Sequence, residues 1–380
     1  MAGTKQFKYR EKVTVSGFSR TLAERIDGYF QGRGISRHAN AGMVAKTVLG
    51  LLAWIATYAW LMRGRFTPLG VIGVYFLHGY AQLFMAFNIA HDGNHNAYSS
   101  RRWLNRVTGC VFDLVGASSY MWRLLHNDAH HAFVNVHEAD TTLISGKVFR
   151  FTPQDPRRPW HRYQHLYAPL LYCLSTLDWV LTKDFRWLRD DKSFGNRRSV
   201  RHPAGELVLL FAGKAFYFTY MLVLPLLYVR APWWTIVAGF LVMHAFLGFT
   251  IALIFQPNHF NEEAAYPEAE ADGSIANNYI QHIFDTTSDY AREKPFTTWI
   301  LGSLNLHVVH HMFPGICHVH YPALTEIVRT TAAEHGLRYR ENRSVAGAFL
   351  AHLRWLKVLG AADEVRAASA ARPTAWGTGI

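Results

Sequence analysis

Four long apolar runs separated by polar segments dominate the pattern of hydrophobic and polar positions along the 380-residue chain. Each run is longer than the roughly 20 residues that an α-helix needs to cross the hydrocarbon core of a bilayer. The pattern therefore predicts an all-α membrane protein with four transmembrane helices, near residues 41–62, 66–90, 205–229 and 233–255.

The connections between these runs predict how the spans pair. Only Arg63-Gly-Arg65 joins the first two spans and Arg230-Ala-Pro-Trp-Trp234 joins the last two, so we expect two helical hairpins. Four crossings place all long polar segments on one side of the membrane. We expect a basic N-terminal segment at residues 1–40, one domain at 41–330 that contains the four spans and a helical cap, and a C-terminal segment with a flexible tail at 331–380.

Composition supports the membrane assignment and predicts the sidedness. Half of the residues are hydrophobic and only 17% are charged, against about 25% in soluble domains. Eight Lys and Arg residues lie in 1–40 and sixteen in 91–204, so the positive-inside rule makes the polar side cytoplasmic. The net charge of +12 suits an anionic membrane surface. Nothing in the chain resembles a nucleic-acid-binding motif, so no nucleic-acid partner is expected.

Cysteine usage agrees with this placement. Cys110, Cys173 and Cys317 form no CxxC motif and no disulfide framework, which fits a reducing cytoplasm. The first 40 residues are polar and basic and contain no apolar core of a signal peptide.

Three histidine clusters carry the candidate chemistry. Neutral imidazole is the commonest side-chain ligand of transition metals, and eight imidazoles are too many for one ion and suit two. On an α-helix, residues four apart share a face, so His91 with His95, and His126 with His130, can each hold one ion. An adjacent pair points about 100° apart and can serve two ions. The clusters are His91-Asp-Gly-Asn-His95, His126-Asn-Asp-Ala-His130-His131 and His307-Val-Val-His310-His311.

The surroundings of the clusters favour iron at the membrane face. The first cluster follows the second span directly, and the other two follow short apolar runs at 107–121 and 299–306, the first of which is too short to span. Zinc sites usually close with four ligands, often including thiolate or carboxylate, and a carboxylate di-iron bundle needs Glu-x-x-His motifs, which the chain lacks. A histidine-rich site for two iron ions fits best.

With its boxes HDGNH, HNDAHH and HVVHH in this order, the chain resembles the integral-membrane fatty acid desaturases over approximately residues 41–330. The sequence MFPGICHVHYP after the third box looks like that of bacterial acyl-lipid and linoleoyl-CoA-type enzymes. The resemblance implies a membrane enzyme, in a bacterial inner membrane, that uses two iron ions and O₂ to form a cis double bond in a fatty acyl chain. It also implies a ninth iron ligand just beyond the fourth span, where His259 stands.

Departures from the family pattern limit what is carried over. The third box begins with His307 where front-end desaturases often have glutamine, so the position of desaturation cannot be transferred. His202-Pro-Ala-Gly205 matches only part of the heme motif of fused cytochrome b5 domains. We therefore expect electrons from a separate donor, such as ferredoxin or a cytochrome b5-like protein with its reductase. The acyl group can be carried by CoA, acyl carrier protein or a lipid.

Other polar residues are candidates for supporting roles. Side chains between or after the ligands can orient imidazoles, as second partners of a metal site do; these are Asp92, Asn127, Asp128, Glu138, Asp140, His318 and His320. Lys46 lies near a span end, where it can snorkel, and Lys214 is either functional or snorkelling. An apolar tunnel is expected, with Phe76, Phe84, Phe246 and Phe249 as possible lining or ordinary packing residues.

Two rival functions remain open at this point. A hydroxylase, epoxygenase or acetylenase would use the same scaffold and differ only in how the substrate lies. A histidine-rich metal transporter would place facing ionisable residues inside the spans, whereas these histidine clusters lie beyond them.

Overall fold

The computed structural model describes residues 6–10, 17–143, 147–189, 196, 200–276 and 278–361, so almost all of the predicted tail at 361–380 lies outside the described residues. The described chain is mostly helical. Four continuous helical stretches are long and apolar enough to cross a membrane. They are α2 (Ala41–Arg63); α3 (Pro68–Met85) with η2 (Ala86–Ala90) and α4 (His91–Asn94); α11 (Ala204–Phe218) with η7 (Thr219–Val223) and α12 (Leu224–Tyr228); and α13 (Trp233–His259).

The starts of these helices follow local sequence signals. The Asn40 side chain accepts a hydrogen bond from the Met43 amide and caps α2, and Thr67 caps α3 in the same way, with Pro68 in its first turn. The second and fourth stretches run four residues past the predicted ends at 90 and 255. This extension carries His91 and His259 beyond the apolar part of each helix.

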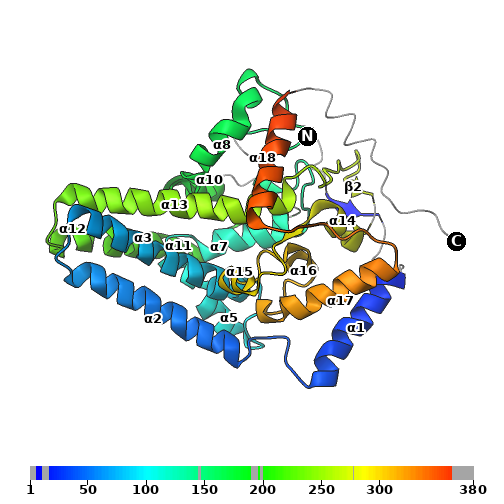
Figure 1. Cartoon of the computed structure of the whole chain (residues 1–380), viewed down its shortest axis with the longest axis horizontal. Coiled ribbons are helices and arrows are strands. Elements are labelled where there is room, and N and C mark those ends of the chain that lie inside the picture. The colour runs from blue at the N-terminus through cyan, green and yellow to red at the C-terminus, as the bar shows by residue number, and fades with distance from the viewer. Residues whose placement is uncertain are drawn as a thin grey trace.

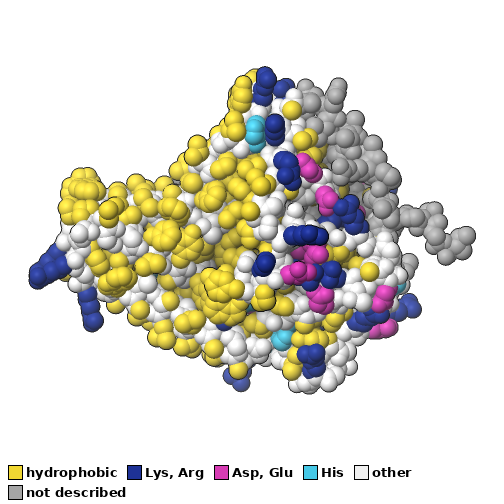
Figure 2. Space-filling view, in the orientation of Figure 1, with side chains coloured by type: hydrophobic (Ala, Val, Ile, Leu, Met, Phe, Trp, Pro, Cys, Tyr) yellow, Lys and Arg dark blue, Asp and Glu magenta, His cyan; other side chains and the backbone are white. Residues whose placement is uncertain are grey.

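The long helices pack around α3. It lies against α2 on one side and α13 on the other, as Figure 1 shows. Gly79 and Gly239 permit the close contact of α3 with α13, because a Cβ at Gly79 would lie 2.4 Å from Met243 and one at Gly239 would lie 2.6 Å from the Tyr75 ring. In Figure 2, exposed apolar side chains gather over these helices, whereas most charged side chains in view, including all the acidic ones, lie to the right of them.

The remaining elements form what we call the polar cap, the described residues of 6–40, 95–189 and 260–361. The short run at 107–121 is not one helix but belongs to α5 (Arg102–Gly109), α6 (Val111–Leu114) and α7 (Ser119–Trp122). The π-helix η3 (Arg123–His130) follows. Next come η4 (Thr141–Leu143), η5 (Pro159–Tyr163), α8 (Gln164–Tyr172), α9 (Ser175–Asp178), η6 (Trp179–Lys183) and α10 (Asp184–Arg189).

The C-terminal part of the cap carries the third histidine cluster. It contains α14 (Tyr279–Thr286), α15 (Pro295–Ile300), α16 (His307–Met312), η8 (His318–His320), α17 (Tyr321–Glu334) and α18 (Val345–Ala361). Both ends of the described chain pack onto the cap. The N-terminal helix α1 (Gly17–Arg33) lies along α17, with Arg25 paired to Glu334 at 2.7 Å, and α18 lies against α8 and α13.

Two small parallel strand pairs fasten the ends of the described chain to the cap. Strand β1 (Lys8–Tyr9) pairs with β2 (Ser274–Ile275), and β3 (Asp289–Tyr290) pairs with β4 (Glu341–Asn342). The segment near residue 8 is therefore held by a loop more than 260 residues away in the sequence.

The two lysines in the apolar helices do not snorkel. Lys46 is only 5% exposed and donates to the Trp299 carbonyl at 2.7 Å. Lys214 is 6% exposed, and its ammonium lies 2.7 Å from Asp184 and 2.7 Å from the Gly116 carbonyl. The prediction for Lys46 was wrong because the cap folds back over the end of α2 and supplies acceptors there, so the ammonium need not reach water.

Candidate metal centre

The fold brings all nine predicted histidines into one buried cluster. His91 begins α4 and His95 directly follows its last residue, while His126 and His130 lie on η3 with His131 directly after it. His259 is the last residue of α13, and α16 supplies His307, His310 and His311. The ends of two long apolar helices and two segments of the polar cap thus meet at one point.

Within the cluster the side chains form two groups of four. In each group the ring nitrogens that face one another all lie within 4.8 Å. The first group is His91, His95, His126 and His310, and the second is His130, His259, His307 and His311. The doublet on α16 therefore divides between the groups, as expected for neighbours that point about 100° apart on a helix.

The second histidine box departs from the predicted pairing. His126 and His130 fall in different groups although they lie four residues apart. The segment is wound as a π-helix, in which residues five apart, such as His126 and His131, also come close to the same face. The His131 amide donates to the His126 carbonyl at 2.8 Å, and their Nε2 atoms are 3.0 Å apart. His131 also lies 2.9 Å from His310 Nε2 and stacks on His311 at 4.1 Å between ring centroids, so it stands between the two groups.

The spacing of the ring nitrogens fits metal ions. A metal–imidazole bond is about 2.0–2.1 Å long, so two nitrogens at right angles on one ion lie about 3 Å apart. The observed Nε2 separations of 2.9, 3.0 and 3.2 Å match this value. In addition, the Nε2 atoms of His91, His95 and His307 are buried without a hydrogen-bond partner. Buried polar atoms are rarely left so, and a metal ion would satisfy them.

Fixed partners on the outer ring nitrogens turn several imidazoles toward the centre. His130 Nδ1 lies 3.1 Å from Asp140, His259 Nδ1 lies 3.2 Å from the Thr286 carbonyl, and His307 Nδ1 lies 2.9 Å from the Leu304 carbonyl. An acceptor at Nδ1 holds the proton there and leaves Nε2 free as a ligand. All three residues belong to the second group.

Burial keeps several imidazoles of the cluster neutral and available to cations. Burial, together with the neighbouring imidazoles, lowers the pKa of His126, His131, His310 and His311 well below the usual value. The pKa of Asp140 is lowered, whereas that of an isolated buried acid would be raised. Burial alone would raise its pKa, but His130 and the hydrogen bonds from Thr142 outweigh this and lower it. Its carboxylate therefore stays charged beside the second group.

The other predicted supporting residues have mixed outcomes. Asp92 contacts His318, and its Oδ1 atom lies 3.9 Å from His91 Nδ1. Asn127 donates to the Asn94 carbonyl and not to an imidazole. Glu138 is exposed and Asp128 half-buried. His320 Nε2 lies 3.1 Å from the His38 carbonyl and is not in either group of four.

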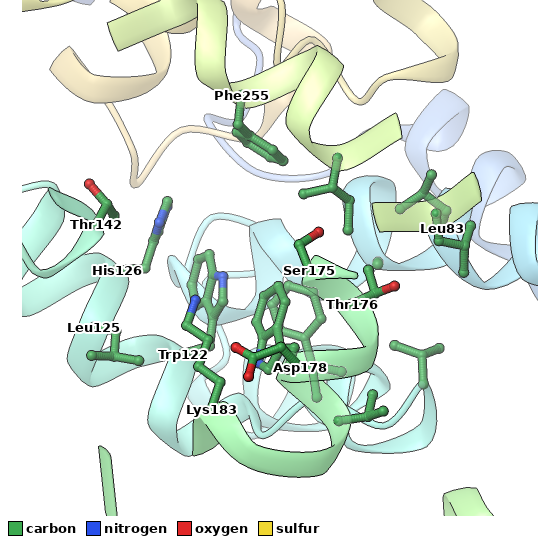
Figure 3. Close-up of a pocket in the computed structure, with 18 of the residues that line it drawn as sticks. Leu83, Trp122, Leu125, His126, Thr142, Ser175, Thr176, Asp178, Lys183 and Phe255 are labelled. Carbon is green, nitrogen blue, oxygen red and sulfur yellow. The ribbon is translucent and has the colours of Figure 1, made fainter. Parts of the chain in front are cut away.

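A cavity of about 420 Å³ opens beside the cluster. Its wall includes His91, His126, His130 and His259, and continues over apolar side chains such as Leu83, Phe87, Phe112, Trp122 and Phe255. Figure 3 shows His126, Trp122 and Phe255 at one side of this space, with Ser175, Thr176 and Leu83 at the other and Asp178 and Lys183 below.

One face of α13 gives the cavity its length. His244, Leu247, Ile251, Phe255 and His259 all line it, at spacings of three or four residues. The fifteen-residue separation of His244 and His259 corresponds to about 22 Å of helix. The cavity therefore reaches from the histidine cluster deep between the apolar helices, where Tyr217 is hydrogen-bonded to His244 at 3.0 Å.

The lining aromatics were not found from the sequence. None of Phe76, Phe84, Phe246 and Phe249 is among the residues that line this cavity. Phe76 instead makes an edge-to-face contact with Phe246, and Phe84 packs at a tilt against Trp299. A signal was nevertheless present, because counting back from His259 in helical steps gives Phe255, Ile251, Leu247 and His244.

Fold and site together define a protein with four membrane-length helices and a buried nine-histidine cluster, able to hold two metal ions, at the end of a long apolar cavity. Comparison with known families is consistent with this class: the fatty acid desaturase family matches residues 66–343. The chain belongs to this family and is an oxidoreductase that desaturates fatty acids.

Individual relatives support the same assignment. An sn-1 linoleoyl-lipid 6-desaturase from Synechocystis is 31% identical over 96% of this chain and 100% of the relative. An acyl-lipid (8-3)-desaturase from Physcomitrium patens is 31% identical over 90% of this chain and 72% of the relative. A third, an acyl-lipid (8-3)-desaturase from Mortierella alpina, is 29% identical over 90% of this chain and 78% of the relative.

Proposed function

We propose that two iron ions bind in the nine-histidine cluster and that a lipid-linked acyl chain lies in the adjoining cavity while a cis double bond is formed. His91, His95, His126 and His310 would hold one ion, and His130, His259, His307 and His311 the other, with His131 able to join either. The observation that carries the proposal is that four of these histidines form part of the wall of an apolar cavity.

When bound, the two irons would supply the reduction of O₂ and the oxidising power that removes two hydrogens from adjacent carbons. The chain's own residues do the rest. The buried surroundings keep the imidazoles neutral and hence available as ligands. Asp140 and the carbonyls of Leu304 and Thr286 fix the orientation of the second group. Apolar side chains such as Phe87, Leu247 and Ile251 exclude water and hold the acyl chain of the substrate extended past the histidine cluster.

A lipid carrier for the acyl group is favoured over CoA or acyl carrier protein. Several relatives that match over most of this chain are named as enzymes that act on acyl lipids. The cavity also has a polar part, where Asp178 and Arg186 are 43% and 62% exposed and paired at 2.7 Å. A lipid head group at this surface would leave its acyl chain free to enter between the apolar helices.

The placement in the membrane follows from the same features. The four long helices would span the bilayer as two hairpins, with the polar cap on the cytoplasmic side, where the basic residues of 1–40 and 91–204 gather. A separate donor, such as ferredoxin or a cytochrome b5-like protein with its reductase, would deliver two electrons per turnover to the cap.

The test is fatty acid analysis of a host that expresses the wild-type protein or His310→Ala, with double bonds located by mass spectrometry. We expect a new unsaturated acid with the wild type and none with His310→Ala, because a lost ligand lowers both metal binding and reactivity. His335→Ala is the matched control, since His335 is exposed and outside the cluster. A hydroxy, epoxy or acetylenic product with the wild type would contradict desaturation and indicate a rival oxidation.

A further inference from the structure

Three buried polar side chains from distant parts of the chain meet beside the first group of histidines. Lys46 comes from the second turn of α2, Asp92 from α4 and His318 from η8. They are 5%, 2% and 1% exposed. Burying a charge is costly unless it is paired, so their contacts must account for two buried charges.

The contacts form a continuous chain of hydrogen bonds. The Lys46 ammonium lies 3.1 Å from His318 Nε2 and donates to the Trp299 carbonyl at 2.7 Å. His318 Nδ1 lies 2.9 Å from Asp92 Oδ2, and the His318 amide donates to the same oxygen at 3.1 Å. Because an ammonium can only donate, Nε2 of His318 is the acceptor and its Nδ1 carries the proton that Asp92 accepts.

This arrangement balances charge internally. One ammonium and one carboxylate are joined through a neutral imidazole, so the network is neutral as a whole. Asp92, Cys317 and His318 do present metal-ligand atoms within 4.8 Å of one another. However, the Lys46 ammonium already lies at hydrogen-bond distance from His318 Nε2 and supplies the positive charge that a metal ion would otherwise bring. The group therefore acts as an internal ion pair and not as a third metal site.

The network joins the two segments that supply most of the first group. Asp92 directly follows His91, and its backbone carbonyl accepts from the Ala97 amide at the end of the turn that carries His95. His318 follows α16, which carries His310. Asp92 Oδ1 lies 3.9 Å from His91 Nδ1, on the side of the ring opposite its unpartnered Nε2. The carboxylate is thus placed to hold α4 at a fixed distance from the segment after α16.

We propose that Lys46, His318 and Asp92 are positioning residues for the first metal-binding group, with Lys46 supplying from the first long helix the charge that keeps Asp92 in place. The inference rests on the proposed function, since it requires a metal ion held by His91, His95, His126 and His310. The second group has its own supports in Asp140 and two carbonyls, so the network acts on one of two ions.

The experiment measures iron content and iron affinity of the purified full-length protein. We expect Lys46→Met and Asp92→Asn each to weaken iron binding by about 10–100-fold, the effect typical of lost second partners of metal ligands, and only at the first group. Each variant would then retain about half of the wild-type iron. The double variant Lys46→Met/Asp92→Asn, which restores charge balance, would recover most of the loss.

Lys214→Met is the matched control. It also removes a buried lysine of an apolar helix that is paired with an aspartate. Lys214 contacts Asp184 and the carbonyls of Gly116 and Trp179, and none of the nine cluster histidines. We expect it to lower the unfolding temperature while both irons stay bound. This separates a positioning role from general destabilisation, because the Lys46 and Asp92 variants should lose iron selectively.

The outcomes distinguish the inference from the function on which it rests. A wild-type protein without iron would refute the proposed function itself. A wild type with two irons, and single variants that bind both with unchanged affinity, would overturn only the positioning role. A double variant that binds or accumulates no better than the poorer single variant would overturn it too, because the two charges would then not be coupled.

Discussion

Replacing Asp140 with asparagine tests how the second group of histidines is held. The Asp140 carboxylate is 2% exposed and accepts four hydrogen bonds, from His130 Nδ1 at 3.1 Å, the Asn135 amide at 3.0 Å, and the Thr142 amide and hydroxyl at 2.9 and 2.7 Å. Asparagine keeps the size of the side chain. It removes the negative charge and leaves one acceptor oxygen, so the side chain can no longer accept both from His130 and the Asn135 amide on one oxygen and from Thr142 on the other.

The size of the effect follows from these contacts. Loss of a carboxylate partner of a metal-bound imidazole typically weakens metal binding about 10–100-fold, which corresponds to about 1.4–2.7 kcal/mol. Because Asp140 contacts only His130 among the cluster ligands, the loss should fall on the second group. The remaining hydrogen bonds change from charged to neutral acceptors, which lowers the free energy of unfolding by about 1–3 kcal/mol.

The assay is anaerobic titration of the apoprotein with Fe²⁺ or Co²⁺, followed by absorbance and by metal analysis after desalting. We expect one ion to bind to Asp140→Asn as to the wild type and the other to bind more weakly. Asp155→Asn is the matched control, since Asp155 also contacts a histidine, His137 at 3.4 Å, but outside the cluster. If Asp140→Asn binds both ions with wild-type affinity, the reasoning about the oriented imidazole is refuted.

Three further predictions follow from the cavity, the buried ion pair and the cluster. Ile251→Trp should shift the products toward shorter acyl chains, because it fills the cavity between the cluster and its deep end, whereas Phe246→Trp on the same helix should not; an unchanged chain-length profile in fatty acid analysis would contradict this. Lys214→Met should cost about 3–5 kcal/mol by leaving Asp184 buried and unpaired, and adding Asp184→Asn should restore most of the thermal stability; equal unfolding temperatures of single and double variants would count against it. The apoprotein should lose stability as pH falls below about 6.5, because the unfolded state takes up protons that the buried imidazoles of His126, His131, His310 and His311, with their lowered pKa values, do not. The loss should reach up to about 1.4 kcal/mol per pH unit for each of these four histidines; a thermal midpoint that stays constant from pH 7.5 to 5.5 would contradict their neutral state.

Much of the architecture could be predicted from the sequence because it depends on short-range patterns. A run of more than twenty apolar residues fixes a long helix whatever surrounds it, and all four were located to within about four residues at each end. The residue type and spacing of the histidine boxes likewise predict a metal centre. Their convergence from residues 91 to 311 was expected because one ion needs ligands from several segments.

The division of ligands between the two groups could not be predicted in the same way. Assigning His126 and His130 to one ion relied on their spacing alone, but the segment is a π-helix that also brings the Nε2 atom of His131 within 3.0 Å of that of His126. Whether a segment takes the extra residue per turn depends on its tertiary contacts. Lys46 shows the same limit, since its burial depends on Trp299 and His318, which lie more than 250 residues away.

The central claim is that nine histidines from four segments hold two irons. Metal analysis combined with Mössbauer spectroscopy of the purified wild-type protein tests this most directly, with His131→Ala measured beside it. The account predicts about two iron ions per chain in nitrogen-rich sites, in keeping with the two groups of four, and a disturbed signal for both ions in His131→Ala because that residue stands between them. One ion per chain, or zinc in place of iron, would contradict it.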